Sequence, residues 1–296
     1  MSAPTLSQHG GLEVLVPVSA SDYPKLVKHL RTQQPHSLKV IGHLTSNVKS
    51  PDWKTEVYVD SWSHLSVVIC LNRKHIGPYI TLSDTDIYLH STCSEKLKEI
   101  LLNSTVIDWG NTVFFDGIDD ALLPDLQEIA PQSGKLKLEF CANIHLHTNT
   151  DRLNWATPNG TLLSPLTVAE ARIVLKNWKF GRDWMLSEIE HIIQTNLTSG
   201  LFTNEGELVA WALEGFYGGI GFVHTLENHR RKGYAKIVVA DLTKKMLTAG
   251  QTPWAHVEDH SEKGVSERLL ESVGFLKSDV RQAFIGFAPH GKEIIW

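Results

Sequence analysis

The 296-residue chain has little cysteine and no long apolar run. Its three cysteines, Cys70, Cys93 and Cys141, are odd in number and widely spaced, which is not the pattern of a disulfide framework or of a thiolate metal site. We therefore expect reduced thiols and no metal. No stretch approaches the roughly 20 apolar residues that a membrane-spanning helix needs, so we also expect no membrane span.

An excess of basic charge is absent as well. The formal net charge is −5. This argues against nucleic acid as a partner, because the chain has no excess of positive charge to neutralise a phosphate backbone. Residues 1–11 lack both the apolar core of a signal peptide and the Arg-rich character of a mitochondrial presequence. We expect an intracellular protein, cytoplasmic or mitochondrial, whose length fits one or two domains.

Residues 219–236 combine features that predict an anion site. The short apolar stretch 219–225 is typical of a buried strand, the turn 230–233 is basic and contains a glycine, and helical periodicity begins at residue 234. The first turn of a helix offers free N–H groups and a positive dipole end, and glycine lets a phosphate approach the backbone closely. The alternative is a basic helix start that faces solvent.

The first half of the chain alternates between strand and helix patterns, which predicts an α/β or α+β domain. We expect strands over 38–44, 55–60, 67–71, 79–90, 106–109, 113–115 and 136–146, and helices over 23–30, 94–102 and 119–129. Residues 148–165 are rich in Thr, Asn, Pro and Gly, as linkers are. We place the domain boundary there and expect domains at 1–150 and 151–296.

The second half begins with two predicted helices, over 168–178 and 184–196, the first starting with a capping box at Thr167 and Glu170. The turn 204–206 predicts a hairpin of 201–202 with 208–213. The strand 219–225, the basic turn, a helix over 234–249 and a strand over 254–257 follow. A helix capped by Ser261 and ended by Gly274, then a strand over 280–287, complete the pattern.

Two motifs in this half resemble those of the GCN5-related N-acetyltransferase superfamily. Arg230, Gly233 and Ala235 match Gln/Arg-x-x-Gly-x-Gly/Ala, the loop that binds the pyrophosphate of acyl-CoA, and residues 269–275 are similar to the later motif Leu-Tyr-x-x-x-Gly-Phe. The element order is also similar. The resemblance implies an α+β fold in which helices flank a mixed central sheet.

Over most of its length the chain is similar to the glycine N-acyltransferase family of animals. The resemblance rests on short fragments in the family's order, at 38–42, 59–62, 67–70, 107–109, 178–181, 205–206, 211, 225–226, 230–233 and 256–258. It implies two tandem acyl-CoA N-acyltransferase-like domains. The N-terminal copy would be degenerate and unable to bind CoA, because it has no Arg-x-x-Gly-x-Gly/Ala loop.

The family resemblance also implies a reaction. Its members transfer an acyl group from acyl-CoA, a co-substrate, to the amino group of glycine or another small amine. We expect the backbone N–H groups of 231–236 to bind the pyrophosphate and the strand backbone to pair with the pantetheine arm. The expected acyl-CoA-binding residues are Val223, Thr225, Arg230, Arg231, Lys232, Gly233, Tyr234, Ala235 and Lys236.

The acid–base residues of the family are not carried over. Gly219 stands where the glycine acyltransferases have the glutamate that looks like their general base, and Leu270 stands where many superfamily members have the tyrosine that protonates the thiolate. His224 and Glu258 are the catalytic candidates instead, because a base must take the proton of the acceptor amine. Alternatively, His224 is a strand residue, and Glu258 belongs to a turn cluster.

Glu214, Asp259 and His260 are further acid–base candidates, with capping or turn contacts as the alternative. The aromatic pairs Trp178/Phe180 and Phe216/Tyr217 either line an acyl or acceptor pocket or belong to the core. Gly218, Gly219 and Gly221 have no side chains, so they leave space beside one strand. We expect a substrate or an aromatic neighbour such as Trp211 to fill that space. A Gly219→Glu substitution would then either raise the rate or block the site.

Three functions follow from these observations. The first is an acyl-CoA-dependent N-acyltransferase acting on glycine or another small amine. The second is a pseudoenzyme that binds acyl-CoA without catalysis, suggested by Gly219. The third is an unrelated α/β binding module.

Overall fold

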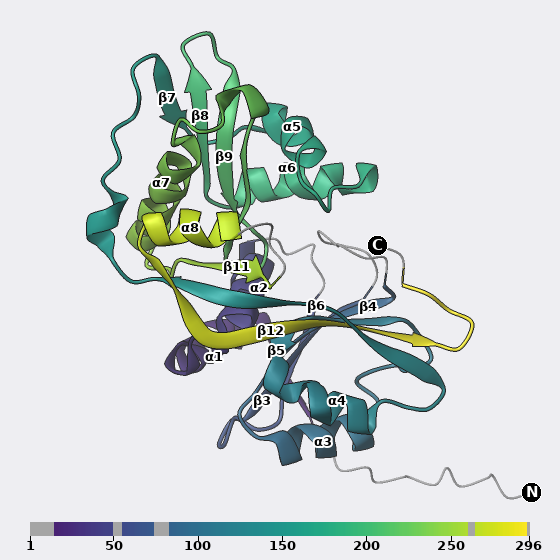
Figure 1. Cartoon of the computed structure of the whole chain (residues 1–296). Helices are drawn as coiled ribbons and strands as arrows, with labels where there is room; N and C mark the ends of the chain where they lie inside the picture. Colours follow the sequence, from purple (N-terminus) through teal and green to yellow (C-terminus); the bar gives the residue numbers. More distant parts are fainter. Residues whose placement is uncertain (1–14, 50–54, 74–82, 260–263, 295–296) are drawn as a thin grey trace, which may run out of the picture.

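The computed structural model describes residues 15–49, 55–73, 83–259 and 264–294 (Figure 1). Their strands form one mixed sheet of 12 strands in the order β1-β2-β3-β4-β5-β12-β6-β11-β10-β9-β8-β7. Among the described residues, no helix is both long enough and apolar enough to cross a bilayer. The expected α+β fold with a mixed central sheet is confirmed.

The helices and longer strands follow in chain order. The first half contains β1 (Val16–Pro17), α1 (Tyr23–Leu30), α2 (Leu38–Lys49), β2 (Thr55–Val59), β3 (Val67–Arg73), β4 (Thr85–Ser91), α3 (Ser94–Asn103), β5 (Val113–Asp119), α4 (Leu123–Ile129) and β6 (Gly134–His147). The second half contains β7 (Thr161–Ser164), α5 (Ala171–Lys176), α6 (Leu186–Thr195), β8 (Thr198–Thr203), β9 (Leu208–Glu214), β10 (Ile220–Thr225), α7 (Tyr234–Thr248), β11 (Trp254–Glu258), α8 (Val265–Ser272) and β12 (Phe275–Pro289).

The two halves exchange strands at the centre of the sheet. β12, from the second half, lies between β5 and β6, and its Ala283 is in register with Ile118 on one side and Cys141 on the other. β6, from the first half, lies between β12 and β11, where Asn143 faces Val257. Each half therefore depends on a strand of the other to complete its part of the sheet.

Helices cover both faces of the sheet. Because side chains alternate along a strand, Val68 and Cys70 of β3 face a core with α1, α2, α5 and α6, while Ile69 faces a core with α3 and α4. A further core joins α7 and α8 to β8–β11. In Figure 1, α3 and α4 lie at the first-half end of the sheet and α7 and α8 at the second-half end.

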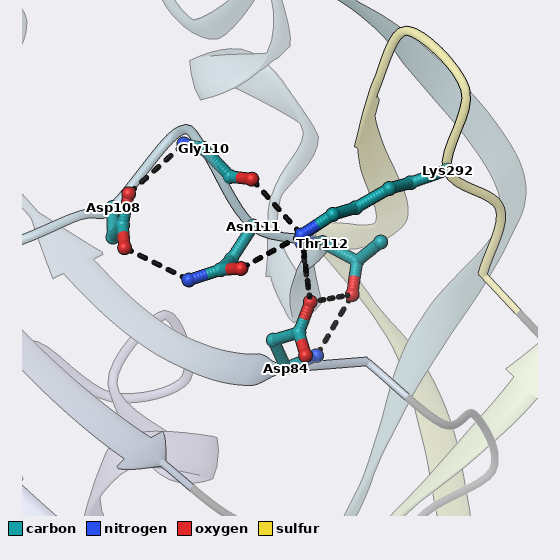
Figure 2. Close-up of polar contacts among 6 residues, drawn as sticks. All are labelled: Asp84, Asp108, Gly110, Asn111, Thr112 and Lys292. Carbon is teal, nitrogen blue, oxygen red and sulfur yellow. Dashed lines mark hydrogen bonds and ion pairs between the residues drawn. The ribbon is translucent and has the colours of Figure 1, made fainter.

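The segment after β12 is tied to the first half by a lysine. Lys292 Nζ donates to the Gly110 carbonyl (3.1 Å) and to Asn111 Oδ1 (2.8 Å), and it lies 4.0 Å from Asp84 Oδ2 (Figure 2). Asp84 in turn accepts hydrogen bonds from the backbone and hydroxyl of Thr112. These contacts tie the segment after β12 to the loops before β4 and β5.

Most expected elements are present, and two strand predictions are wrong. Residues 38–44 belong to the helix α2, and residues 106–109 form a bend in which Val106 and Ile107 pack into the core under α3 and α4. Val40 and Ile41 favour strands, and α2 is buried on nearly every side between the two halves. The capping box at Thr167 and Glu170 and the left-handed Gly274 are confirmed. Residues 79–82 and Ser261 lie outside the described residues.

Candidate active site

β10 and β11 begin as parallel neighbours and then separate. Along these two fully described strands, one pair is in register, Ile220 with Ala255. The equivalent parallel pair of the first half, β4 and β5, stays in register over three pairs, from Thr85–Val113 to Ile87–Phe115. The second half therefore has an open gap between its central strands where the first half is closed.

A cavity of about 620 Å³ occupies this gap. Residues of both halves of the chain line it: Lys39, Asp116, Phe140, Ala142, Asn177, Trp178, Lys179, Phe180, Phe216, Tyr217, Ile220, Gly221, Phe222, Val223, His224, Ala255, His256, Val257, Glu258, Ser266, Leu269, Leu270 and Phe284. Its size is that of a small-molecule site.

A β-bulge frees backbone groups on the β10 side of the cavity. The register between β10 and β9 shifts between Gly221 and His224, so Phe222 and Val223 have no in-register partner there, and Phe222 has a φ of 55°. A bulge leaves its extra residue outside the hydrogen-bond ladder. This strand edge can pair with an extended ligand or donate an N–H to a developing oxyanion.

The turn after β10 is shaped for an anion. Arg231 and Gly233 both have left-handed backbones, with φ of 65° and 80°, and α7 begins at Tyr234. A Cβ at Gly233 would have no heavy atom within 4 Å, so the turn is open on that side. Alternating conformations of this kind direct successive N–H groups into one concave site, next to the positive end of α7.

Basic side chains surround the turn. Arg230 Nε donates to the Thr225 carbonyl at 3.2 Å, which folds this side chain back along β10. The Lys236 ammonium lies 5.1 Å from the centre of the Trp155 ring, which is 40% exposed. Trp155 comes from the linker, and sequence reasoning missed it because no local pattern places it beside α7.

His224 and Glu258 line the same cavity. The His224 ring is stacked on Trp211, with 5.0 Å between centroids, and its pKa is lowered by burial and by the charge of Arg230. It is therefore neutral at pH 7 and able to accept a proton. Glu258 forms an ion pair with Lys179 Nζ at 2.5 Å. The structure thus brings the two candidates to one cavity without testing their roles.

The remaining acid–base candidates have structural partners. Glu214 is 2% exposed and accepts hydrogen bonds from the Leu197 backbone and from Gln251 Nε2. Hydrogen bonds and charge from Arg281 lower the pKa of Asp259, which makes it a poor base at neutral pH. His260 lies outside the described residues.

Tyr217 fills the space beside Gly221 of β10 and the glycines of the turn that precedes it. A Cβ at Gly215, Gly219 or Gly221 would come within 2.4–2.7 Å of the Tyr217 ring or hydroxyl. An aromatic neighbour fills this space, as one of the two alternatives predicted, but it is Tyr217 and not Trp211, which packs on His224. The Tyr217 ring therefore occupies the space in which a side chain at residue 219 would lie.

The other expected cavity residues are apolar. Leu270, which stands where many superfamily members have a tyrosine, is 4% exposed and lines the cavity without offering a proton. Both aromatic pairs, Trp178/Phe180 and Phe216/Tyr217, line the cavity, and all but Phe180 also belong to or pack on the core. Trp178 also packs on Phe222 of the bulge, with 4.6 Å between ring centroids.

Sequence reasoning missed a group of buried polar residues deep in the cavity. Lys39 on α2 and Asp116 on β5 form an ion pair of 2.6 Å. His256 on β11 hydrogen bonds through Nε2 to Gln282 Oε1 at 2.7 Å. Lys39 and His256 lie in two of the family-like fragments, but the sequence does not show that they share a site, because α2, β5, β11 and β12 meet only in the folded sheet. Within the described ranges, no cluster of three or more His, Cys, Asp or Glu side chains is arranged to hold a metal.

Two family models together match most of the chain. The model of aralkyl acyl-CoA:amino acid N-acyltransferase matches residues 19–195, and the model of FR47-like protein matches residues 198–284. Human glycine N-acyltransferase-like protein 2 is 25% identical over 268 residues, which cover 84% of this chain and 90% of that protein. Mouse glycine N-acyltransferase is 24% identical over 272 residues, covering 83% and 90%.

Solved structures show the same fold. A crystal structure of a Drosophila protein has a TM-score of 0.75 at 16% identity, covering 94% of this chain and 99% of that one. A tandem GNAT protein from the clavulanic acid biosynthesis pathway has a TM-score of 0.54 at 12% identity, covering 94% and 99%. These likenesses establish the tandem fold, and the family match excludes an unrelated α/β module. The protein belongs to the aralkyl acyl-CoA:amino acid N-acyltransferase family, which includes the glycine N-acyltransferases.

Proposed function

We propose that this protein transfers an acyl group from acyl-CoA to the amino group of glycine or another small amino acid or amine. The observation that carries the proposal is the open edge of β10, with its bulge at Phe222 and its anion-shaped turn at 230–233. The pantetheine arm would pair with the backbone of Val223 and Thr225, and the pyrophosphate would lie on the N–H groups of 231–236.

The reaction needs a neutral amine, a donor for the oxyanion and a base. The amine attacks the thioester carbonyl carbon, a C–N bond forms, the C–S bond breaks, and CoA leaves as a thiolate. The bulge at Phe222 and Val223 offers N–H groups that can stabilise the oxyanion. In this proposal His224, through a water, takes the amine proton, and Glu258 is the second candidate.

One observation favours a second function, that of a pseudoenzyme that binds acyl-CoA. The Tyr217 ring occupies the place where a side chain at residue 219 would lie, and Leu270 offers no proton to the thiolate. Neither acid–base position of the family is therefore filled by an equivalent group. The fold and the CoA turn would be kept in either case, so only turnover separates the two functions.

Release of free CoA tests the proposal. A panel of acyl-CoAs is combined with glycine and small amines from about pH 6 to pH 9, and we expect acceptor-dependent release that rises with pH as more amine is neutral. His224→Ala should lower kcat by about 10²-fold or more if His224 is the base. His64→Ala, at an exposed loop position, is the matched control.

Binding is measured separately from turnover. A ligand at 100 times its Kd stabilises the folded state by about 2.7 kcal/mol, so CoA should raise the Tm clearly. A protein that CoA stabilises but that releases no CoA with any acceptor would be the pseudoenzyme. Equal pH–rate profiles for wild type and His224→Ala would remove His224 from the mechanism.

A further inference from the structure

The cavity holds two ion pairs in very different surroundings. Lys179 and Glu258 form an ion pair in which the lysine side chain is 61% exposed. Lys39 and Asp116 form the other, with side chains that are 4% and 9% exposed. Both residues of the buried pair come from the first half of the chain, whereas the open strand edge belongs to the second.

The buried ammonium has unused hydrogen-bonding capacity. An ammonium carries three N–H donors, and among the described residues Lys39 donates one hydrogen bond, to Asp116 Oδ1 at 2.6 Å. Ring faces also lie close to the ammonium, with the Phe284 centroid at 4.4 Å and the Tyr217 centroid at 5.8 Å. The cavity surface around Lys39 can therefore supply a cation to an anionic group.

The backbone beside Asp116 leaves room for the Lys39 side chain, and Asp116 favours its charged form. Gly117 has a φ of 68°, and a Cβ there would lie 2.5 Å from Lys39 Nζ, so the backbone beside Asp116 leaves room for the ammonium. Burial lowers the pKa of Lys39, and the charge and hydrogen bond of Asp116 oppose this shift. A buried ion pair is weak evidence for stability, since apolar residues of similar volume often serve as well.

We propose that Lys39 binds the carboxylate of the acceptor amino acid, with Asp116 as the residue that positions it. The first half of the chain, which lacks a CoA loop, would thus supply acceptor specificity to the second. Tyr217 and His256 lie beside Lys39, and both are neutral at pH 7, because burial raises the pKa of Tyr217 and lowers that of His256 to about 3. The acidic groups near the position of an incoming carboxylate are Asp116 and the neighbouring Asp86. Burial raises the pKa of Asp86 well above its usual range, which favours its neutral form.

This inference rests on the proposed transferase function for the acceptor, but its test measures binding alone. Glycine and glycinamide are titrated calorimetrically into the CoA-saturated protein, since the two differ in the carboxylate. We expect the wild type to bind glycine about 10- to 100-fold more tightly, the range of a charge-assisted hydrogen bond. The double variant Lys39→Met/Asp116→Asn removes both charges of the pair together, so neither is left buried alone. We expect it to bind glycine and glycinamide equally and to keep the wild-type affinity for CoA.

A matched double variant controls for loss of an ion pair. Lys98→Met/Asp125→Asn removes the same charges from a contact between α3 and α4, and Lys98 and Asp125 do not line the cavity. It should keep the preference for glycine. Equal binding of glycine and glycinamide by the wild type, or binding of neither, would overturn the inference without any variant. Absence of CoA release would overturn the proposed function and leave the binding comparison valid.

Discussion

Tyr217 explains why the strand edge beside it is built from glycine. Its ring lies where the side chains of residues 215, 219 and 221 would project, so none of these positions has room for a Cβ. Tyr217 is held in turn by Trp254, with 5.5 Å between ring centroids, and by the close approach of Gly42 on α2 to the backbone at 217–218. Gly219 and Tyr217 are therefore parts of one packing arrangement.

Gly219→Glu is expected to disrupt packing instead of restoring a base. The added Cβ would lie 2.7 Å from the Tyr217 ring and 3.0 Å from Trp254, both of which are held by neighbours. Even Gly219→Ala should lower the free energy of unfolding by about 1–3 kcal/mol, as overpacking does. Urea denaturation measures this, and Gly219→Glu should release CoA more slowly than wild type.

Gly110→Ala is the control for that experiment. Gly110 is exposed, and its Cβ would approach only the Asp108 carboxylate, at 3.1 Å. It should change stability much less than Gly219→Ala. If the two variants unfold at the same urea concentration, or if Gly219→Glu speeds transfer, the packing account of Tyr217 is wrong.

His43 should make the protein sensitive to mild acid. Burial, with a smaller effect from the charge of Lys39, lowers its pKa to about 3, and its ring stacks on Tyr88. The unfolded chain takes up a proton near pH 6.5 and the folded chain does not, so the contribution is complete above pH 6.5 and is lost as pH falls towards 3. Between pH 7 and pH 5 the loss is up to about 2 kcal/mol.

His43→Phe should remove this part of the pH dependence. The variant loses the contact of Nε2 with Thr55 Oγ1, which lowers stability at every pH, but its unfolding free energy should fall less between pH 7 and pH 5. Urea denaturation at both pH values measures the difference. His64→Phe, at an exposed position, should keep the wild-type dependence. An unchanged slope in His43→Phe would mean that His43 is protonated in the folded state.

At the scale of elements, the turn between β10 and α7 is the part whose function is easiest to isolate. Gly233→Glu should lower CoA affinity by at least about tenfold, because it puts a negative charge and a Cβ where the pyrophosphate would lie. Pantetheine has no pyrophosphate, so its binding should change little. Calorimetric titration with both ligands separates a phosphate effect from a general loss of the site.

Gly250→Glu is the matched control. Gly250 follows the other end of α7, has a φ of 69°, and like Gly233 has no heavy atom within 4 Å of an added Cβ. Both variants carry the same backbone strain and the same charge. A Gly233→Glu protein that binds CoA as tightly as Gly250→Glu would show that the turn does not bind phosphate.

The elements that sequence patterns identified are those with one buried face or a clear local signal. The hairpin of β8 and β9, the capping box at Thr167 and the glycine-ended α8 all fall in this class. The strand prediction for α2 rests on Val40 and Ile41, which favour strands, whereas Ile41, Leu44 and Val48 recur at helical spacing. The error matters, because α2 carries Lys39 into the cavity.

At the scale of the whole molecule, a chain cut at the predicted boundary of 150/151 should not yield two stable domains. A fragment of residues 1–150 would lack β12, which separates β5 from β6, and both strands would expose unpaired edges. We expect either fragment alone to aggregate and the two expressed together to associate. Size-exclusion chromatography and circular dichroism measure this.

The intact chain should unfold in one cooperative transition, because β6 and β12 belong to both halves. A monomeric 1–150 fragment with its own cooperative transition would contradict this expectation. The boundary itself stays a prediction, and the experiment tests it directly.

The candidate site was predictable only where it is local in sequence. The turn 230–236 and the flanking β10 were recognisable because strand, turn and helix follow one another along the chain. Lys39 and Asp116 were not, since 77 positions separate them and α2 and β5 meet only in the folded sheet. Tyr217 was seen as an aromatic near the site, but the three glycines that it covers required the structure.

The position of β12 has a consequence for biosynthesis. The ribosome makes β12 about 130 residues after β6. At 5–20 residues per second, the strand edges of β5 and β6 that pair with β12 stay unpaired for roughly 6 to 26 seconds. The first half cannot finish its sheet until β12 has been made. A stop codon or frameshift before Phe275 would therefore leave both halves incomplete, and the nascent N-terminal strands would need a chaperone until β12 arrives.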